Sequence, residues 1–532
     1  MVSGAAGPLP FTVESVLQMA SATLPYRILP LLSRTLVLEL NVARLQELLT
    51  GATPEERFAS FVERLRDPQT ADAILREYPV LARQVVLDLE LFREAIGEIF
   101  SQLAADWPEI VTRLFGGQDP GPLAAFDGGA GDRHRRGRSV RILSFASGAR
   151  LVYKPRSLAV EAHFQELLAW IDSLGGPGFR TLGVLDRGDH GWMEFAAFEP
   201  CRSREEVARF HERLGGLLAV LYALAATDCH YENLIAAGEH PVVVDLESLF
   251  HPQIQRGPRP QPTEDLRPAE DLRSQFALHS VLRVGLLPFQ VGQEDDFAGV
   301  DISGVAAIDG QPTPEKVIQW RGIGTDEMRV ERDRAIMEGG HNRPILEGRP
   351  AQVGEFREEM TSGFAAVYRL LADRPDELRR RLSPFADDPV RVVLRPTRIY
   401  GALLIESFHP DYLGDALDRD RLFDRLWLEA DVQPSLARVP QSQPSRSRLA
   451  RTISRKRWRS AASSGVGKRS WTWRRKSRLP RSPWQRQWFC PGPRPRLRRT
   501  ACSISRRSSS RSSPLRAWRY PCRRLRHTPG AP

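Results

Sequence analysis

The stretch from Ala226 to Phe250, ATDCHYENLIAAGEHPVVVDLESLF, sets polar groups that could do chemistry beside two apolar segments. LIAA and PVVVDLE predict two short buried strands joined by the tight turn GEHP. Asp245 and Glu247 lie two residues apart, so we expect them on one face at the end of the second strand. Burying carboxylates without partners is costly, and a divalent cation with phosphate oxygens would offset that cost. The preceding loop adds three more polar groups, Asp228, His230 and Asn233.

A phosphate site also needs a cation, and Lys154 supplies one at the end of the predicted strand RLVYK. The glycines Gly128, Gly129 and Gly131 precede the hairpin, SVRILSF and RLVYK around the turn ASG, that carries this lysine. Enzymes of kinase-type phosphoryl transfer show the same order along the chain: a glycine-rich turn, a strand, a lysine, a helix, and then Asp…Asn…Asp. Lys154 would then hold nucleotide phosphates.

In the same chemistry the polar loop and the second strand would hold the metal and the substrate hydroxyl. Asn233 and Asp245 would hold Mg²⁺, because hard cations take oxygen ligands. Asp228 would orient or deprotonate a hydroxyl. Each residue also has a plainer interpretation: Lys154 as a surface lysine, His230 as a donor to a backbone carbonyl, and Glu247 as the partner of a nearby arginine.

The elements that must position these groups follow from periodicity and capping. Residues 1 to about 125 predict a helical module, with Thr53 as an N-cap, Pro54 in the first turn and Glu56 closing a capping box. VEAHFQELLAWIDSL predicts a helix after Lys154, and a strand pair follows near TLGVLDRGDHGWMEFAAF. A long helix capped by Ser203 then leads into the polar loop. RVVLRPTRIY predicts a strand that passes into a helix.

Composition limits the class of protein. The chain has 532 residues, and none of its apolar runs reaches the ~20 residues that span a bilayer. Its N-terminus lacks the features of a signal peptide. Five cysteines without paired spacing indicate free thiols and no structural zinc, so we expect a cytoplasmic protein with no transmembrane segment.

The net charge of +11 hides two unlike regions. Of the 76 basic residues, 27 lie in residues 441–532, which contain no acidic residue, so the first 440 residues carry 49 basic and 65 acidic groups. After about Ala437, Ser, Arg, Pro and Trp dominate and aliphatic residues become sparse. Such a segment cannot bury enough aliphatic surface to offset its ordering entropy, and we expect it to be disordered.

Four motifs carry a family resemblance: YKPRS, TDCHYEN, DLESLF and RVVLRPTRIY. In this order they resemble the dehydratase domain of class II lanthipeptide synthetases, the LanM family, over roughly residues 15–437. The resemblance implies an α+β fold with a bilobal, kinase-like catalytic domain similar to lipid kinases and an added helical N-terminal part. It also implies ATP- and Mg²⁺-dependent phosphorylation of Ser and Thr in a LanA-type precursor peptide with a leader. Phosphate elimination to dehydroalanine and dehydrobutyrine would follow.

The resemblance further implies which residues serve each step. Arg391 and Thr397 match the residues that serve phosphate elimination in the family. A guanidinium can bind the departing phosphate through two parallel hydrogen bonds, and a threonine can donate a hydrogen bond to it. The sequence does not name the base that removes the α-proton. The residues matching the phosphorylation set are Asp132, His134, Lys154, Asp228, His230, Asn233, Asp245 and Glu247, with Lys154, Asp132 and His134 near the cofactor and Asn233, Asp245 and Glu247 at the metal.

The sequence departs from the family after Val439. We therefore expect residues 1–125 to be the helical part, 126–437 the catalytic region, and 438–532 a basic low-complexity tail that reads like translation in a shifted frame. The zinc-dependent cyclase of the family is not expected here, and a separate cyclase would be a further partner. Two alternatives stay open: an inactive truncated form that only binds the leader peptide, and a nucleic-acid binder that acts through the basic tail. We expect no nucleic-acid partner, because the tail lacks an aliphatic framework.

Overall fold

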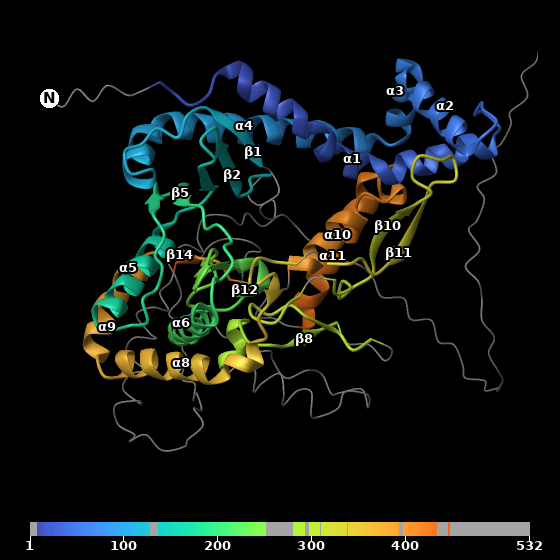
Figure 1. Cartoon of the computed structure of the whole chain (residues 1–532). Helices are drawn as coiled ribbons and strands as arrows, with labels where there is room; N and C mark the ends of the chain where they lie inside the picture. The colour runs from blue at the N-terminus through green and yellow to red at the C-terminus, as the bar shows by residue number, and fades with distance from the viewer. Residues whose placement is uncertain are drawn as a thin grey trace, which may run out of the picture. The chain divides into compact units, whose positions relative to one another are not determined.

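The computed structural model describes most of the chain up to Val432 (Figure 1). These residues belong to the first of the chain's two units, Met1–Arg469. The described residues are 8–127, 137–251, 280–292, 297–308, 310–337, 339–392, 397–432 and 445–446. For residues 397–398, 425–432 and 445–446 only the backbone is described. The predicted disordered tail therefore lies outside the described residues, apart from strand β15 (Ser445–Arg446).

Four helices form the N-terminal part, and the sequence signals at the second are confirmed. The side chain of Thr53 accepts a hydrogen bond from the Glu56 amide at 3.2 Å, and the Glu56 carboxylate accepts one from the Thr53 amide at 3.3 Å. This capping box satisfies two amides that have no partner within the helix. The four helices are α1 (Val13–Leu45), α2 (Pro54–Arg66), α3 (Pro68–Glu77) and α4 (Pro79–Leu114).

A five-stranded antiparallel sheet follows in the order β1-β2-β3-β5-β4. The predicted hairpin is present, with Arg141 paired to Tyr153 and Ser144 to Arg150. Apolar residues of α4, among them Leu103 and Ile110, pack on the sheet and fix β3, which ends at Lys154. The strands are β1 (Leu123–Asp127), β2 (Arg141–Phe145), β3 (Arg150–Lys154), β4 (Val184–Asp186) and β5 (Gly191–Glu194).

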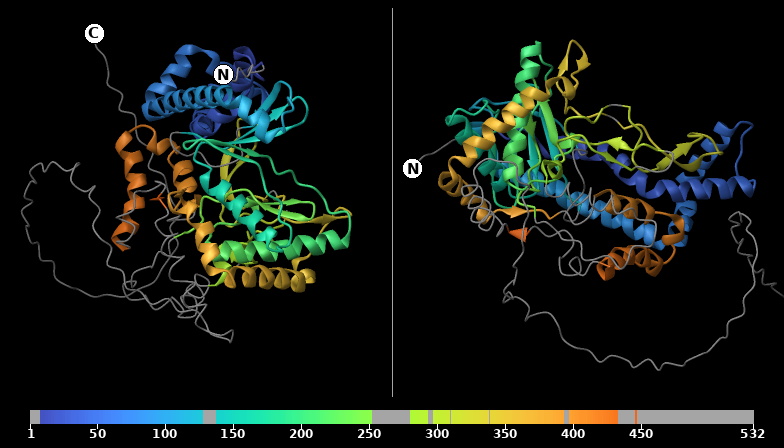
Figure 2. Two further views of the ribbon diagram at one scale, coloured as in Figure 1. Left: turned by 90° about the vertical axis from the view of Figure 1, so that its left-hand side faces the viewer. Right: turned by 90° about the horizontal axis from the view of Figure 1, so that it is seen from below.

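The main core lies around two helices that run side by side, α6 (Arg204–Ala223) and α8 (Arg357–Ala372) (Figure 2). Glycines allow this close approach: a Cβ at Gly215 would lie 1.9 Å from the carbonyl oxygen of Met360. Helix α5 (Ala159–Ser173) and the antiparallel hairpin of β6 (Leu234–Ala237) and β7 (His240–Val243) contribute to the same core. The predicted cap of α6 is confirmed, because Ser203 accepts a hydrogen bond from the Glu206 amide.

A second hairpin connects the later part of the chain to the N-terminal helices. It consists of β10 (Val317–Arg321) and β11 (Arg329–Asp333), and its turn contacts α2 through a 2.7 Å ion pair between Arg57 and Asp326. The remaining elements are β8 (Gln290–Val291), β9 (Val300–Asp301), β12 (Ile345–Leu346), β13 (Arg349–Pro350), β14 (Pro389–Val390), α9 (Pro375–Leu382), α10 (Thr397–Glu406), α11 (Ala416–Val432), and the 3₁₀ turns η1 (Tyr231–Asn233), η2 (Val281–Val284), η3 (Val353–Phe356), η4 (Pro384–Ala386) and η5 (Pro410–Tyr412).

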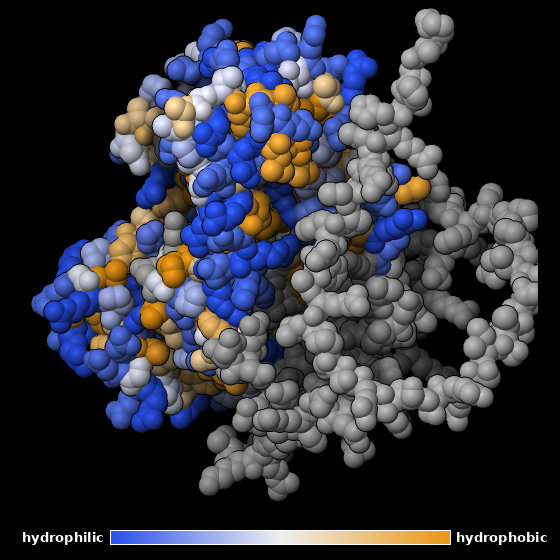
Figure 3. Space-filling view, turned by 90° about the vertical axis from the view of Figure 1, so that its right-hand side faces the viewer, coloured by the Kyte–Doolittle hydropathy of each residue, from blue (hydrophilic) through white to orange (hydrophobic). Residues whose placement is uncertain are grey.

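The described part of the chain thus mixes long helices with small antiparallel sheets. None of the helices in these residues is both long enough and apolar enough to cross a bilayer. On the face drawn in Figure 3 the coloured surface is mainly hydrophilic, with small apolar patches between polar side chains.

Candidate active site

The predicted strand pair brings Asn233 and Asp245 to the same end of one hairpin. Leu234 pairs with Val243, and the Val244 amide donates to the Asn233 carbonyl oxygen at 3.0 Å. Asn233 therefore lies just before β6, and Asp245 lies just after the residue opposite it. The two side chains proposed for one metal thus start from neighbouring backbone positions.

The expectation that Asp245 and Glu247 share a strand face is wrong. Strand β7 ends at Val243, so Asp245 lies beyond the strand, and Glu247 begins the turn that follows. Asp245 Oδ1 accepts a hydrogen bond from the Glu247 amide at 3.2 Å, which is the local bond by which an aspartate closes a turn on its own backbone. This turn ends the extended conformation, so the two-residue period of a strand no longer applies.

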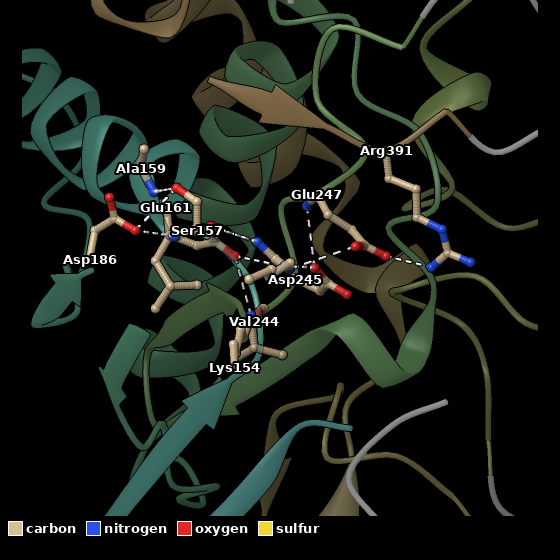
Figure 4. Close-up of polar contacts among 11 residues, drawn as sticks. Lys154, Ser157, Ala159, Glu161, Asp186, Val244, Asp245, Glu247 and Arg391 are labelled. Carbon is tan, nitrogen blue, oxygen red and sulfur yellow. Dashed lines mark hydrogen bonds and ion pairs between the residues drawn. The ribbon is translucent and has the colours of Figure 1, made fainter. Parts of the chain in front are cut away.

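Lys154 enters the site from the end of β3 and is almost fully buried, at 3% exposure. Its Nζ donates to the carbonyl oxygen of Val244 at 2.6 Å and lies 3.3 Å from Glu161 Oε1 (Figure 4). The interpretation of Lys154 as a surface lysine is therefore wrong. A strand lysine paired with a glutamate on the next helix is the arrangement that protein kinases need for activity.

Arg156 and Glu161 also belong to the site, although neither was predicted from the sequence. Arg156 grips both carboxylate oxygens of Glu161, at 2.5 and 3.0 Å, and its NH2 lies 2.9 Å from Asp245 Oδ1. Glu161 is 1% exposed. Burial raises the pKa of this carboxyl, but the charges of Arg156 and Lys154 lower it by more, so the net pKa lies below the ordinary value. Two features of the sequence could have pointed to these residues: Arg156 lies within the motif YKPRS, and Glu161 lies in the first turn of the helix that follows.

Asp245 is also held as a carboxylate. Burial raises its pKa, whereas the charges of Lys154 and Arg156 and the Glu247 amide lower it, and the net pKa lies below the ordinary value. The side chain remains 35% exposed, so solvent and ligands can reach it. An ionised, accessible carboxylate suits a cation ligand.

The loop before β6 holds Asp228 in an unusual backbone conformation, with φ of +66°. Such values are uncommon outside glycine, and Asp is among the residues that adopt them more readily. The Asn233 side-chain amide donates to the Asp228 carbonyl oxygen at 2.8 Å, which fixes this conformation. The Asp228 side chain is 41% exposed, so it is accessible to a substrate hydroxyl.

His230 accepts a hydrogen bond through Nδ1 from the Glu232 amide at 3.3 Å and so caps η1. The plainer interpretation of His230, as a donor to a backbone carbonyl, does not hold for Nδ1, which accepts from an amide instead. Its Nε2 lies 4.0 Å from Asp228 Oδ1, close enough to influence that carboxylate electrostatically. The structure thus brings Asp228, His230 and Asn233 together on one short loop.

Glu247 connects this cluster to Arg391. Arg391 NH1 donates to Glu247 Oε1 at 2.5 Å, and the Arg391 amide donates to the Glu247 carbonyl oxygen at 2.6 Å. Glu247 Oε2 lies 3.6 Å from Arg156 Nε, so the carboxylate faces two guanidinium groups. The alternative interpretation of Glu247, as the partner of a nearby arginine, is confirmed. Figure 4 shows Glu247 between Asp245 and Arg391.

Three predicted site residues are described by the structure only in part or not at all. Asp132 and His134 lie outside the described residues. Thr397 begins α10, but only its backbone is described.

The donor set fits magnesium and nucleotide. Among the described residues no group of three or more His, Cys, Asp or Glu side chains has the arrangement of a metal cage. Mg²⁺ does not require one, since it commonly binds through one or two carboxylates together with substrate phosphates and water. Asp245 and Asn233 at one hairpin end supply such oxygens, and the neighbouring Lys154 and Arg156 supply positive charge for phosphates.

Comparison with known proteins gives the family. The chain belongs to the family described as a domain of unknown function, DUF4135, whose model matches residues 78–446 and so includes the cluster above. It is also similar to the lacticin 481/lactococcin biosynthesis protein LcnDR2 of Lactococcus lactis subsp. lactis, with 25% identity over 412 residues, 74% of this chain and 42% of the relative. The chain therefore spans less than half of that relative. These matches confirm the resemblance to class II lanthipeptide synthetases.

Proposed function

We propose that the chain acts in lanthipeptide biosynthesis as a kinase-like Ser/Thr dehydratase of a precursor peptide. The name of the relative LcnDR2 supports the pathway. The observation that carries the chemistry is one continuous set of hydrogen bonds and ion pairs, which Arg156 joins in the middle. It runs from Lys154 to Glu161, Arg156, Asp245, Glu247 and Arg391. This set combines the lysine–glutamate pair of kinases with a second arginine suited to phosphate.

In the first half-reaction a Ser or Thr hydroxyl would attack the γ-phosphoryl group of ATP, forming a phosphate ester while the bond to the β-phosphate breaks and ADP leaves. Bound ATP and Mg²⁺ would supply that group and neutralise its charge. Asn233 and Asp245 would provide metal ligands, Lys154 would hold phosphate oxygens, and Asp228 would accept the hydroxyl proton. His230 lies within electrostatic range of Asp228 and would influence that proton transfer.

In the second half-reaction a base would take the α-proton of the phosphorylated residue, the carbon–carbon double bond would form, and the carbon–oxygen bond would break so that inorganic phosphate leaves. Arg391 would hold the departing phosphate, because a guanidinium offers several parallel N–H donors. Its NH1 contacts Glu247, and its Nε and NH2 make no hydrogen bond with the described residues. Thr397 would add a donor from the start of α10.

Mass spectrometry of a co-expressed precursor peptide tests this proposal, with the lacticin 481 precursor as the probe. Loss of one water per modified Ser or Thr is the expected result. Addition of phosphate without loss of water would leave only the first half-reaction. An unmodified peptide, together with no rise in melting temperature on adding ATP and Mg²⁺, would contradict the proposal.

A further inference from the structure

A histidine–aspartate pair outside the cluster described above ties helix α5 to the segment that ends in Arg391. His163 Nδ1 lies 2.8 Å from Asp388 Oδ2, and the Asp388 side chain is only 6% exposed. The His163 ring also meets Phe385 edge-on, at 5.4 Å between ring centroids. Asp388 precedes β14, whose last residue is followed directly by Arg391. The pair therefore lies three residues from the proposed phosphate-binding arginine.

Helix α5 contacts Lys154 and Arg156 with one face and the segment that ends in Arg391 with another. Glu161, which holds Lys154 and Arg156, lies two residues before His163 on this helix. Residues two apart on a helix point in different directions. One face of α5 thus holds the lysine of the phosphorylation site, while another holds Asp388.

The Arg391 segment is held at both of its ends. At one end it is bonded to Glu247 through backbone and side chain. At the other end Asp388 is bonded to His163, and its amide donates to the Phe385 carbonyl oxygen at 3.3 Å. Phe385 also packs against Phe250, with 5.3 Å between the ring centroids. Phe250 lies in the turn that begins at Glu247. Movement of this segment would therefore move the guanidinium.

We infer that His163 and Asp388 are positioning residues for Arg391: they fix it against helix α5, so that a phosphorylated intermediate undergoes elimination instead of leaving as phosphopeptide. This inference rests on the proposed function and adds to it a residue pair that neither touches substrate nor binds cofactor. A displacement of about 1 Å at a reacting group can cost about a hundredfold in rate. We expect the loss of the His163–Asp388 contact at one end of this short segment to allow such a displacement.

The pair is also sensitive to pH. Its hydrogen bond with Asp388 raises the pKa of His163, burial opposes this, and the Asp388 charge together with Glu166 and Asp186 raises the pKa further. A histidine with a raised pKa stabilises its contact fully below the ordinary pKa and loses that contribution as pH rises through the raised value. Elimination should therefore weaken on the alkaline side while phosphorylation continues.

The experiment compares His163→Phe, Asp388→Asn and the double variant in the full chain, with MgATP and the lacticin 481 precursor. We expect the ratio of phosphorylated to dehydrated peptide to rise about tenfold in each single variant, and no further in the double variant. That ratio should also rise with pH in the wild type and become nearly independent of pH in Asp388→Asn. The matched control is His240→Phe, whose histidine is 30% exposed and pairs with Glu239 at the opposite end of the β6–β7 hairpin.

Hydrogen exchange of the peptide that spans residues 385–392 provides a readout independent of catalysis. Faster exchange in His163→Phe than in the wild type and in His240→Phe supports the positioning role, and unchanged exchange overturns it. A wild-type product ratio in both single variants overturns the inference while the proposed function stands. A wild type that transfers no phosphate contradicts the proposed function, and the exchange result then decides alone whether the pair holds the segment.

Discussion

The amine of Lys154 lies 2.6 Å from the carbonyl oxygen of Val244, although the two residues are 90 positions apart in the chain. This bond joins the end of a strand in the five-stranded sheet to the end of the β6–β7 hairpin. Asp245, the next residue, is thereby placed near the lysine charge, which lowers its pKa together with Arg156. The contact makes one site from two separate sheets.

Replacement of Arg391 by alanine should uncouple the two half-reactions. Loss of a charged phosphate donor commonly costs about a hundredfold in the step it serves, so phosphopeptide should accumulate while phosphate transfer continues. Arg391→Lys should recover only part of the elimination, because an ammonium lacks the planar fork. Mass spectrometry of the peptide over time measures both species. Arg421→Ala, at a 76% exposed arginine in α11, serves as the control, and normal dehydration by Arg391→Ala would refute the assignment.

Replacement of Asp245 by asparagine should block both steps. The change keeps the size of the side chain but removes the charge proposed to hold the metal, so phosphate transfer should fall at least about a hundredfold. The increase in melting temperature on adding ATP and Mg²⁺ should shrink in parallel. Asp189→Asn, at an 82% exposed carboxylate, should retain both properties. Full activity in Asp245→Asn would remove this residue from the mechanism.

Removal of the Glu161 charge should destabilise the fold. Glu161 is 1% exposed and faces Lys154 and Arg156, so Glu161→Gln leaves the buried Lys154 and the partly buried Arg156 without their shared carboxylate. Breaking a buried ion pair in this way costs about 3–5 kcal/mol, which denaturant unfolding can measure. The control is Glu63→Gln, whose partner Arg66 is 74% exposed; this change should cost at most about 1 kcal/mol. Equal effects in the two variants would contradict this role of burial.

The same substitution should change the response to acid. The pKa of Glu161 lies below its ordinary value of 4.5, so its stabilising contribution is complete above pH 4.5 and is lost as pH falls through the lowered value. The difference in unfolding free energy between wild type and Glu161→Gln should therefore be constant near neutral pH and shrink below pH 4.5. Denaturant unfolding across this range checks the trend, and a difference that grows on acidification would contradict it.

Two glycines in helices should respond oppositely to alanine. A Cβ at Gly215 would lie 1.9 Å from the Met360 carbonyl oxygen, whereas one at Gly97 has no atom within 4 Å. Gly215→Ala should force α6 and α8 apart and destabilise the protein by about 1–3 kcal/mol or more. Gly97→Ala in α4 should stabilise it by about 0.5–1 kcal/mol through helix propensity. Melting temperatures of the two variants test this, and shifts of the same sign would refute it.

Local signals predicted much of the fold and the central part of the site. The capping box at Thr53, the cap at Ser203 and the β2–β3 hairpin depend on residues a few positions apart, so the sequence was sufficient for them. The order of Lys154, Asp228, Asn233 and Asp245 was also sufficient to select them as one cluster. The prediction of a shared strand face for Asp245 and Glu247 was wrong, because β7 ends at Val243 and the Asp245 side chain then bonds to the Glu247 amide, outside any strand.

What the sequence determined by itself was therefore the elements and the chemical types of side chain, since both follow from short-range periodicity and capping. The tertiary structure alone decided that Arg156 meets Asp245, that Glu247 meets Arg391, and that His163 meets Asp388. These partners are separated by 89, 144 and 225 positions, respectively. Such pairs form only when packing of the apolar core brings distant segments together, and no local pattern records which charges then meet.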